Sequence, residues 1–265
     1  MTEKNVTSDN KQVATKKGTE LANPSVFMDD AGSGLENITA DDLTIPRLKI
    51  LQALSPEVNK RDGKYIEGAE AGDIVNTVTG RIYNEPCGWV EVLPVAYRKF
   101  YLEWQPRESG GGLVQQHTDA EILSKTTTDR TGADVLANGN YIQTSATHFC
   151  IVVDDANSYY QVMIPMAGTQ LKKSRNWNSV MATLKVKSSD GRVFTPPTFS
   201  HKYKLSTVQE SNDRGNWFGW NIELISPITS EEMTIYQAAK EFKQSFKFDD
   251  VSTVSSEEAE GTTPF

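Results

Sequence analysis

Aromatic rings and cations alternate in the segment YRKFYLEW, which runs from residue 97 to residue 104. An unpaired nucleic-acid strand needs this mixture, because every base has a π-face for stacking and every phosphate attracts a cation. In an extended strand, alternate residues share a face, so Phe100, Leu102 and Trp104 would pack inward with Val90 and Val92 if no bulge intervenes. The outward face would then carry three candidates for contact with a nucleic-acid strand: Tyr97, Lys99 and Tyr101. An ordinary aromatic-rich barrel wall is the alternative interpretation.

Further cations gather at the start of residues 169–186, a segment with helical spacing. Its large apolar residues can share one helical face: Leu171, Trp177, Val180, Met181 and Leu184. Lys172, Lys173 and Arg175 fall within the first two turns, and no Asp or Glu stands four residues later to pair with them. We therefore expect these three cations to contact phosphate, although a solvated helix face would have the same composition.

Two more lysines lie in a strand-like segment near the end of the chain, residues 198–209. Alternation places Lys202 and Lys204 on the face opposite Tyr203 and Leu205. Because the apolar residues would face the core, the two lysines would face outward. We expect both of them to contact phosphate.

The next strand-like segment, residues 216–225, contains a tryptophan on its outer face. Its inner face is predicted to hold Phe218, Trp220, Ile222 and Leu224. Trp217 would therefore point away from the core, beside Arg214 in the preceding turn. The missing side chain of Gly219 would let a base or another backbone come close. Trp217 and Arg214 complete the predicted nucleic-acid contacts, and a Trp half-covered by a neighbouring loop is the alternative.

The residue spacing required for metal or nucleophilic chemistry is absent from the sequence. The three histidines lie far apart, and none has a Cys or carboxylate at ligand spacing: His117, His148 and His201. The glycine run at 110–112 is not followed by the Gly-Lys-Ser/Thr of a phosphate-binding loop. Asp154 and Asp155 lie in a predicted hairpin turn, where Asp is favoured for turn chemistry. We expect no enzymatic activity, no cofactor and no metal.

Short strands separated by turn signals must position these residues. They are predicted at 47–54, in a hairpin over 72–83, and at 89–104, 141–153, 158–166, 198–209 and 216–225. Pro94 should make its strand an edge or bulged strand. The polar segment 106–138 is predicted to be a long mobile loop or insertion. A second helix should follow the capping box at Thr229, with an apolar side formed by Ile235, Ala238, Ala239, Phe242 and Phe246. The pattern predicts a mainly β fold with two helices (α+β), an antiparallel OB-like barrel.

The formal net charge of −8 is concentrated at the two ends of the chain. Residues 1–40 carry four Lys against six Asp and Glu, and residues 247–265 carry one Lys against five Asp and Glu. The core between them is close to neutral, so clustered cations could still form a basic groove. We expect a disordered N-terminal arm over 1–34, a core over 35–246 and an acidic disordered tail over 247–265.

The tail ends in Thr263-Pro264-Phe265 after five acidic residues interspersed with Ser and Thr. It resembles the acidic C-terminal tail of bacterial and phage single-stranded DNA-binding proteins, which often ends in Pro-Phe. The core segments MAGTQLKKSR (166–175) and TVQESNDRGNWFGW (207–220) are also similar to those of phage proteins of this kind. The resemblance implies sequence-tolerant coating of single-stranded DNA in phage replication or recombination. It also implies that Pro264 and Phe265 dock replication or recombination proteins while the tail competes with DNA.

Three other functions remain as alternatives. A strand-annealing recombination protein would share the rings and cations but form rings or filaments, a metal-dependent phage nuclease would need converging carboxylates, and a structural virion protein would have no DNA role. No apolar run is long enough to cross a bilayer, so we expect no membrane contact. Cys87 and Cys150 suggest no disulfide framework, which fits the reducing host bacterial cytoplasm. Homo-oligomerisation is left open.

Overall fold

The computed structural model describes residues 27–38, 42–83, 88–154, 158–213 and 215–245. The chain divides into two units, Met1–Leu43 and Thr44–Phe265. In the first unit, residues 27–38 form successive turns with exposed side chains, such as the turn in which Ser33 N donates to Asp30 O over 3.0 Å. The rest of the predicted arm and the whole predicted tail, including Pro264 and Phe265, lie outside the described residues.

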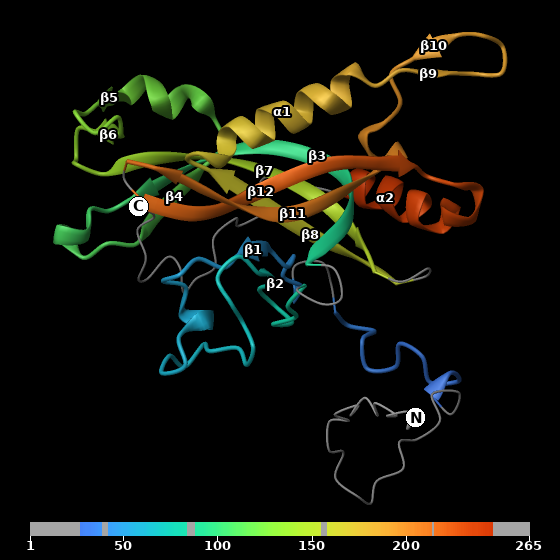
Figure 1. Ribbon diagram of the computed structural model, residues 1–265, viewed down its shortest axis with the longest axis horizontal. Helices are drawn as coiled ribbons and strands as arrows, with labels where there is room; N and C mark the ends of the chain where they lie inside the picture. The colour runs from blue at the N-terminus through green and yellow to red at the C-terminus, as the bar shows by residue number, and fades with distance from the viewer. Residues whose placement is uncertain (1–26, 39–41, 84–87, 155–157, 214, 246–265) are drawn as a thin grey trace, which may run out of the picture. The chain divides into compact units, whose positions relative to one another are not determined.

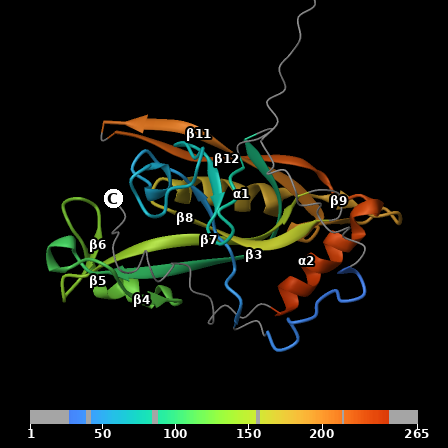
Figure 2. The same cartoon turned by 90° about the horizontal axis from the view of Figure 1, so that it is seen from below.

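The second unit is built on an eight-stranded antiparallel sheet that curls into a half-barrel (Figure 1). Its centre is the pair β3 and β7, which run side by side along their length (Figure 2). On one side, β3 pairs with β11, which pairs with β12, and β7 pairs with β8. Toward the other end of the pair, β3 pairs with β4, and β7 pairs with β6, which pairs with β5. The strands are β3 (Trp89–Trp104), β4 (Leu113–His117), β5 (Thr126–Thr128), β6 (Asp134–Leu136), β7 (Tyr141–Val153), β8 (Tyr159–Ala167), β11 (His201–Asn212) and β12 (Gly215–Pro227).

Two helices and several small elements complete this unit. The helix α1 spans Gln170–Thr183, and α2 spans Met233–Ser245. The small strand pairs are β1 (Leu48–Ile50) with β2 (Ile74–Asn76) and β9 (Val186–Lys187) with β10 (Val193–Phe194). The 3-10 turns are η3 (Pro56–Val58), η4 (Arg107–Ser109), η5 (Ala120–Lys125), η6 (Thr198–Ser200) and η7 (Ser230–Glu232). Both α1 and β1 contact β8 as well as β12, so they bridge the two edges of the curled sheet.

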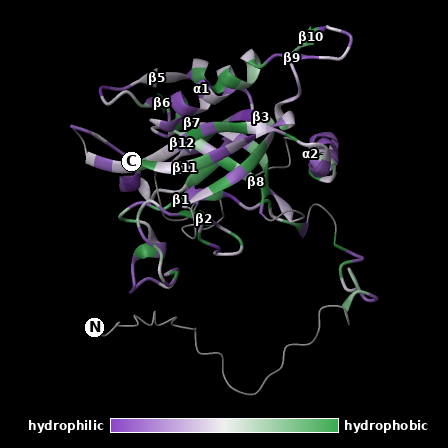
Figure 3. Cartoon of the chain, turned by 45° about the vertical axis from the view of Figure 1, so that its right-hand side comes forward, coloured by the Kyte–Doolittle hydropathy of each residue, from purple (hydrophilic) through white to green (hydrophobic). Residues whose placement is uncertain are grey.

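The apolar core of the described residues contains two large clusters, which lie on the two faces of the sheet, and a small third cluster of Leu51, Ala69 and Val75. One large cluster contains Trp177 and Met181 of α1, and the other contains Ile235, Ala239 and Phe242 of α2. Hydrophobic and hydrophilic stretches alternate along the strands accordingly (Figure 3). The predicted capping box is present, because Glu232 accepts hydrogen bonds from Thr229 N and Oγ1 at the start of α2. Each helix therefore covers one face through part of its predicted apolar side, whereas Val180 of α1 is 42% exposed and Phe246 lies outside the described residues.

The phase of β3 changes at a bulge. Its register with β7 shifts between Pro94 and Ala96, which confirms the predicted bulge, although the strand is central rather than an edge. Val92 belongs to the α1 cluster, whereas Phe100 and Trp104 belong to the α2 cluster. The predicted single inward face from Val90 to Trp104 is therefore wrong, because the extra residue at the bulge exchanges the two faces.

The prediction of a long mobile loop over 106–138 is also wrong. This segment folds into η4, β4, η5, β5 and β6. Its short strands extend the sheet beside the C-terminal end of β3 and the N-terminal end of β7. The mainly β fold with two helices and a curled antiparallel sheet is as predicted, while the OB-like assignment remains a prediction. No helix among the described residues is long and apolar enough to span a membrane.

Candidate functional site

The helix α1 distributes its cations over two flanks. Successive residues of a helix are rotated by about 100°, so Lys172, Lys173 and Asn176 fall on one side of the buried stripe and Arg175 on the other. The buried residues of α1 are Ser174, Trp177 and Met181. The three cations predicted to act together therefore face two different surroundings.

The first flank faces the turn-proximal ends of β11 and β12 across a hollow, which we call the α1–β12 groove. It has a volume of about 580 Å³ and is lined by Thr169, Lys172, Lys173, Asn176, Glu210, Ser211 and Trp217. Lys172 is exposed, and Trp217 is half-buried. The structure thus brings Lys172, Lys173 and Trp217 together, although they are predicted from separate segments of the sequence.

Glu210 lines the α1–β12 groove and is held by three donors. Its Oε1 is 2.8 Å from Lys173 Nζ, and its Oε2 accepts from Trp217 Nε1 at 2.9 Å and Gln170 Nε2 at 3.4 Å. Burial raises the pKa of the Glu210 carboxyl, but these donors outweigh the burial and leave the pKa below its usual value. The carboxylate is therefore charged at neutral pH, and it neutralises Lys173.

Gly219 makes this arrangement possible. A Cβ at this position would lie 2.6 Å from both Gln170 Nε2 and Glu210 Oε2, well inside contact distance. The sequence predicts that Gly219 admits a base or another backbone, and the structure instead places two side chains there. The glycine is needed for the close approach of Gln170 and Glu210 to β12.

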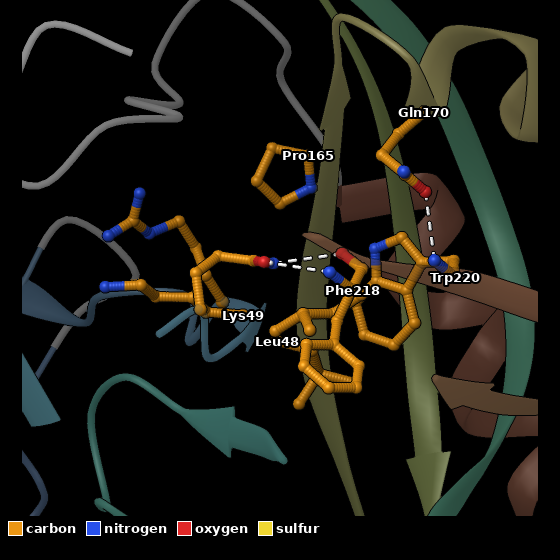
Figure 4. Close-up of a pocket in the computed structure, with 9 residues that line it drawn as sticks. Leu48, Lys49, Pro165, Gln170, Phe218 and Trp220 are labelled. Atoms are coloured by element: carbon orange, nitrogen blue, oxygen red, sulfur yellow. Dashed lines mark hydrogen bonds between the residues drawn. The ribbon is translucent and has the colours of Figure 1, made fainter. Parts of the chain in front are cut away.

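A smaller pocket adjoins the groove at Gln170. It has a volume of about 230 Å³ and is lined by Arg47, Leu48, Lys49, Ile50, Gln52, Pro165, Gln170, Phe218 and Trp220 (Figure 4). Gln170 Oε1 accepts from Trp220 N at 2.9 Å, and the Gln52 amide bonds both Phe218 N and Phe218 O at 2.9 Å. Two glutamine side chains therefore occupy the backbone edge of β12, which would otherwise be open for pairing.

The second flank of α1 faces Tyr97 of β3. This tyrosine is half-buried, its ring lies 4.9 Å from the His148 ring, and its hydroxyl is near enough to Ser174 and Asn178 for both to affect its pKa. Burial raises the pKa of Tyr97. Lys99 is exposed on the same strand, and Arg175 is near enough to Tyr97 to affect that pKa. These residues form a second group, on the opposite flank of α1 from the groove.

The remaining predicted contacts are dispersed. Lys202 is only 14% exposed and lies 3.0 Å from Glu91 Oε1 and 2.6 Å from Glu232 Oε1, so its charge is already neutralised and the phosphate assignment is withdrawn. Lys204 Nζ lies 5.4 Å from the Trp89 ring centroid and 4.0 Å from Glu223 Oε2. Arg214 lies outside the described residues.

The outward orientation predicted for Tyr101 is wrong. Tyr101 is only 7% exposed, and it pairs with Thr144 of β7 on one side and with His117 of β4 on the other. It lies in the interior of the sheet because the supposed loop supplies β4. Tyr101 is therefore a structural residue rather than a stacking candidate.

Sequence reasoning missed Glu210, Gln170 and Asn176. Asn176 could have been found, since helical rotation places it beside Lys172 and Lys173. Glu210 is 37 residues from Lys173 in the sequence and had no local signal. Among the described residues, no group of three His, Cys, Asp or Glu side chains could hold a metal ion.

Comparison with known proteins places the chain in a family of phage proteins. No curated protein and no solved structure matches the chain. Residues 15–252 match the model of a family described as Pam3 phage gp34-like protein. This match covers most of the arm and the whole core, and it confirms the predicted phage character. The chain therefore belongs to the Pam3 phage gp34-like protein family.

Proposed function

We propose that this protein binds single-stranded DNA without sequence preference and that the α1–β12 groove is the primary contact surface. The observation that carries the proposal is the convergence of Lys172, Lys173 and Asn176 from α1 with the half-buried Trp217 ring from β12. An indole can stack on any base, and lysines pair with phosphates whatever the base. This combination favours recognition of the backbone and base faces over readout of sequence.

The groove suits a single strand better than a duplex. In duplex DNA the base faces are stacked on one another, so a ring in a surface groove can reach only phosphates or base edges. An unpaired strand exposes its base faces, and stacking on an aromatic side chain contributes about 1–3 kcal/mol per base. Arg175, Lys99 and Tyr97 on the other flank of α1 would extend the path of the strand.

We further propose a role in phage DNA replication or recombination in the host cytoplasm, which the membership of a phage protein family and the resemblance of the tail support. In this proposal Phe265 and Pro264 dock a replication or recombination protein. The ring of Phe265 suits an apolar pocket, and the acidic residues before it suit a rim of Arg or Lys. Deleting Phe265 should remove the partner from a pull-down and leave DNA affinity unchanged.

The test is a titration of labelled oligo-dT and of duplex DNA at low and high salt. We expect tighter binding to oligo-dT, and an affinity that falls with salt because bound phosphates release counterions. Trp217→Ala should weaken binding to oligo-dT by about 1–3 kcal/mol. The matched control is Tyr159→Ala, which removes another ring, 38% exposed, from β8 outside the groove, and it should leave the affinity unchanged. Equal affinity for the two DNAs, or an equal loss in both variants, would contradict the proposal.

The same protein should be tested for the alternative activities. Acceleration of the pairing of complementary strands would favour a strand-annealing protein, which would use the same rings and cations. Cleavage of a plasmid with Mg²⁺ or Mn²⁺, abolished by Asp154→Ala, would favour a nuclease. We expect neither strand annealing nor cleavage.

A further inference from the structure

The most unusual feature of the α1–β12 groove is that its donors already hold an anion. Lys173 Nζ, Trp217 Nε1 and Gln170 Nε2 come from α1 and β12, and all three point at the carboxylate of Glu210 on β11. The carboxylate is partly accessible, with 23% of the side chain exposed. Three donors around one solvent-accessible carboxylate form a ready-made site for an oxyanion.

We propose that Glu210 occupies a phosphate-binding site and that a backbone phosphate of the bound strand displaces it. This inference rests on the proposed function and adds to it a specific phosphate site and an internal competitor. Phosphate and carboxylate oxygens accept hydrogen bonds from the same donors, an ammonium, an indole N–H and an amide N–H. On displacement, Lys173 exchanges Glu210 for a phosphate and Glu210 turns toward solvent.

The energetics allow the exchange. The Lys173–Glu210 pair is partly exposed on both sides, at 32% and 23%, and ion pairs of this kind contribute little net stability. A single monoanion would nevertheless compete weakly, because Glu210 is held beside the donors by its own chain at a high effective concentration. A strand that also stacks on Trp217 and contacts Lys172 gains enough elsewhere to displace it. The internal carboxylate thus selects extended polyanions with base faces over small anions.

The test compares Glu210→Gln with Glu223→Gln in binding to oligo-dT. Glutamine retains an acceptor oxygen for Trp217 and Lys173 but loses the charge. Glu223 lies on β12 with 55% of its side chain exposed, 4.0 Å from Lys204, so its variant removes one charge from the same sheet outside the groove. We expect E210Q to bind about five- to tenfold more tightly at low salt, because a competing charge at contact distance is gone. The control should change affinity by less than about twofold, because its charge is exposed and screened.

Salt dependence gives a readout that a purely structural role would not change. In the natural protein, the phosphate that binds Lys173 releases a salt cation, while the displaced Glu210 carboxylate takes one up. The net release of salt cations at this contact is therefore small. In E210Q this uptake disappears, and the slope of log K against log salt should become more negative by about 0.7 for a single strand. The gain should vanish in a Lys173→Gln background, because it acts through Lys173.

A second measurement separates this inference from the proposed function. The indole N–H resonance of Trp217, assigned with Trp217→Phe, is followed in ¹⁵N-labelled protein during titration with inorganic pyrophosphate. We expect a saturable shift in E210Q that is absent in the E210Q/K173Q double variant. If oligo-dT does not bind but this shift occurs, the proposed function fails and the anion site stands.

Three results would overturn the inference. Equal gains in E210Q and E223Q would mean that only overall charge matters, and a weaker affinity in E210Q with an unchanged melting temperature would mean that Glu210 assists binding. The absence of a pyrophosphate shift in E210Q would mean that the donors hold no external anion. The first two results would leave single-strand binding itself intact.

Discussion

Lys202 should be a structural residue, and replacing it by Met should destabilise the protein without affecting its contact with DNA. Its ammonium lies between Glu91 of β3 and Glu232, which caps α2, so it ties that helix to the sheet. All three side chains are largely buried, at 14%, 18% and 20% exposed. Met keeps the length of the stem and removes only the charge and its hydrogen bonds.

The size of the effect follows from the geometry. Both carboxylates lie within 3.0 Å of the same Nζ, so without the ammonium they would face each other with no counter-charge. At a separation of roughly 6 Å, two like charges repel by roughly 0.7 kcal/mol in water and roughly 3 kcal/mol at an effective dielectric constant of about 20. Including the lost hydrogen bonds, we expect the free energy of unfolding to fall by about 2–3 kcal/mol at pH 7.

The pH dependence of this loss provides an independent check. Burial raises the pKa of Glu232, but Lys202 and Thr229 outweigh it and lower the pKa overall. Stability from a depressed carboxyl pKa is fully present above the unfolded value of about 4.3 and is lost as pH falls through the folded value. The difference between the natural protein and K202M should therefore be largest near pH 7 and shrink below about pH 4.5.

Urea denaturation at pH 7 and pH 4 measures both effects, with Lys172→Met as the matched control. Lys172 is exposed in the groove, so its variant should change stability by less than about 0.5 kcal/mol. It should weaken binding to oligo-dT, whereas K202M should not. A K202M variant as stable as the natural protein, or a deficit equal at both pH values, would refute the assignment of Lys202 to the ion-pair network.

Three further variants test individual parts of the structure. Burial lowers the pKa of His148 to about 3, so the unfolded state binds more protons than the folded state between about pH 6.5 and 3. The free energy of unfolding should therefore fall by about 1.4 kcal/mol per pH unit as pH drops through that window. His148→Gln should reduce this slope in urea denaturation, and an unchanged slope would contradict the assignment. Gly219→Ala should lower the free energy of unfolding by less than about 1 kcal/mol, because the atoms that its Cβ would meet are the ends of the flexible Gln170 and Glu210 side chains, and a loss of about 3 kcal/mol would show that both side chains are held rigidly. Tyr101→Ala should lower it by about 3–5 kcal/mol, which thermal and urea unfolding would measure, whereas an unchanged stability with weaker DNA binding would restore Tyr101 as a stacking residue.

Local pattern was sufficient to predict many elements of the fold. Alternating apolar residues bounded by a turn predict the β7–β8 hairpin, and three-to-four-residue spacing predicts α1 and α2. The capping box at Thr229 marks the start of the second helix. These signals depend on residues a few positions apart, so they can be read without knowing where the rest of the chain lies. The face of Trp217 follows from the same alternation.

Tertiary structure alone decided which predicted contacts are accessible and which of them meet. Tyr101 is buried because β4 and β7 flank it, and Lys202 is neutralised by Glu91, which is 111 residues away in the sequence. The bulge between Pro94 and Ala96 shifts the phase of β3 by one residue. Glu210 reaches Lys173 of α1 from β11, a strand that is distant from α1 in the sequence. Burial and ion pairing depend on what the folded chain brings within a few ångströms, whereas periodicity shows only which residues share a face. The sequence alone therefore determined the types of element and the chemistry of the candidate residues, and the tertiary structure decided which of those residues form a site.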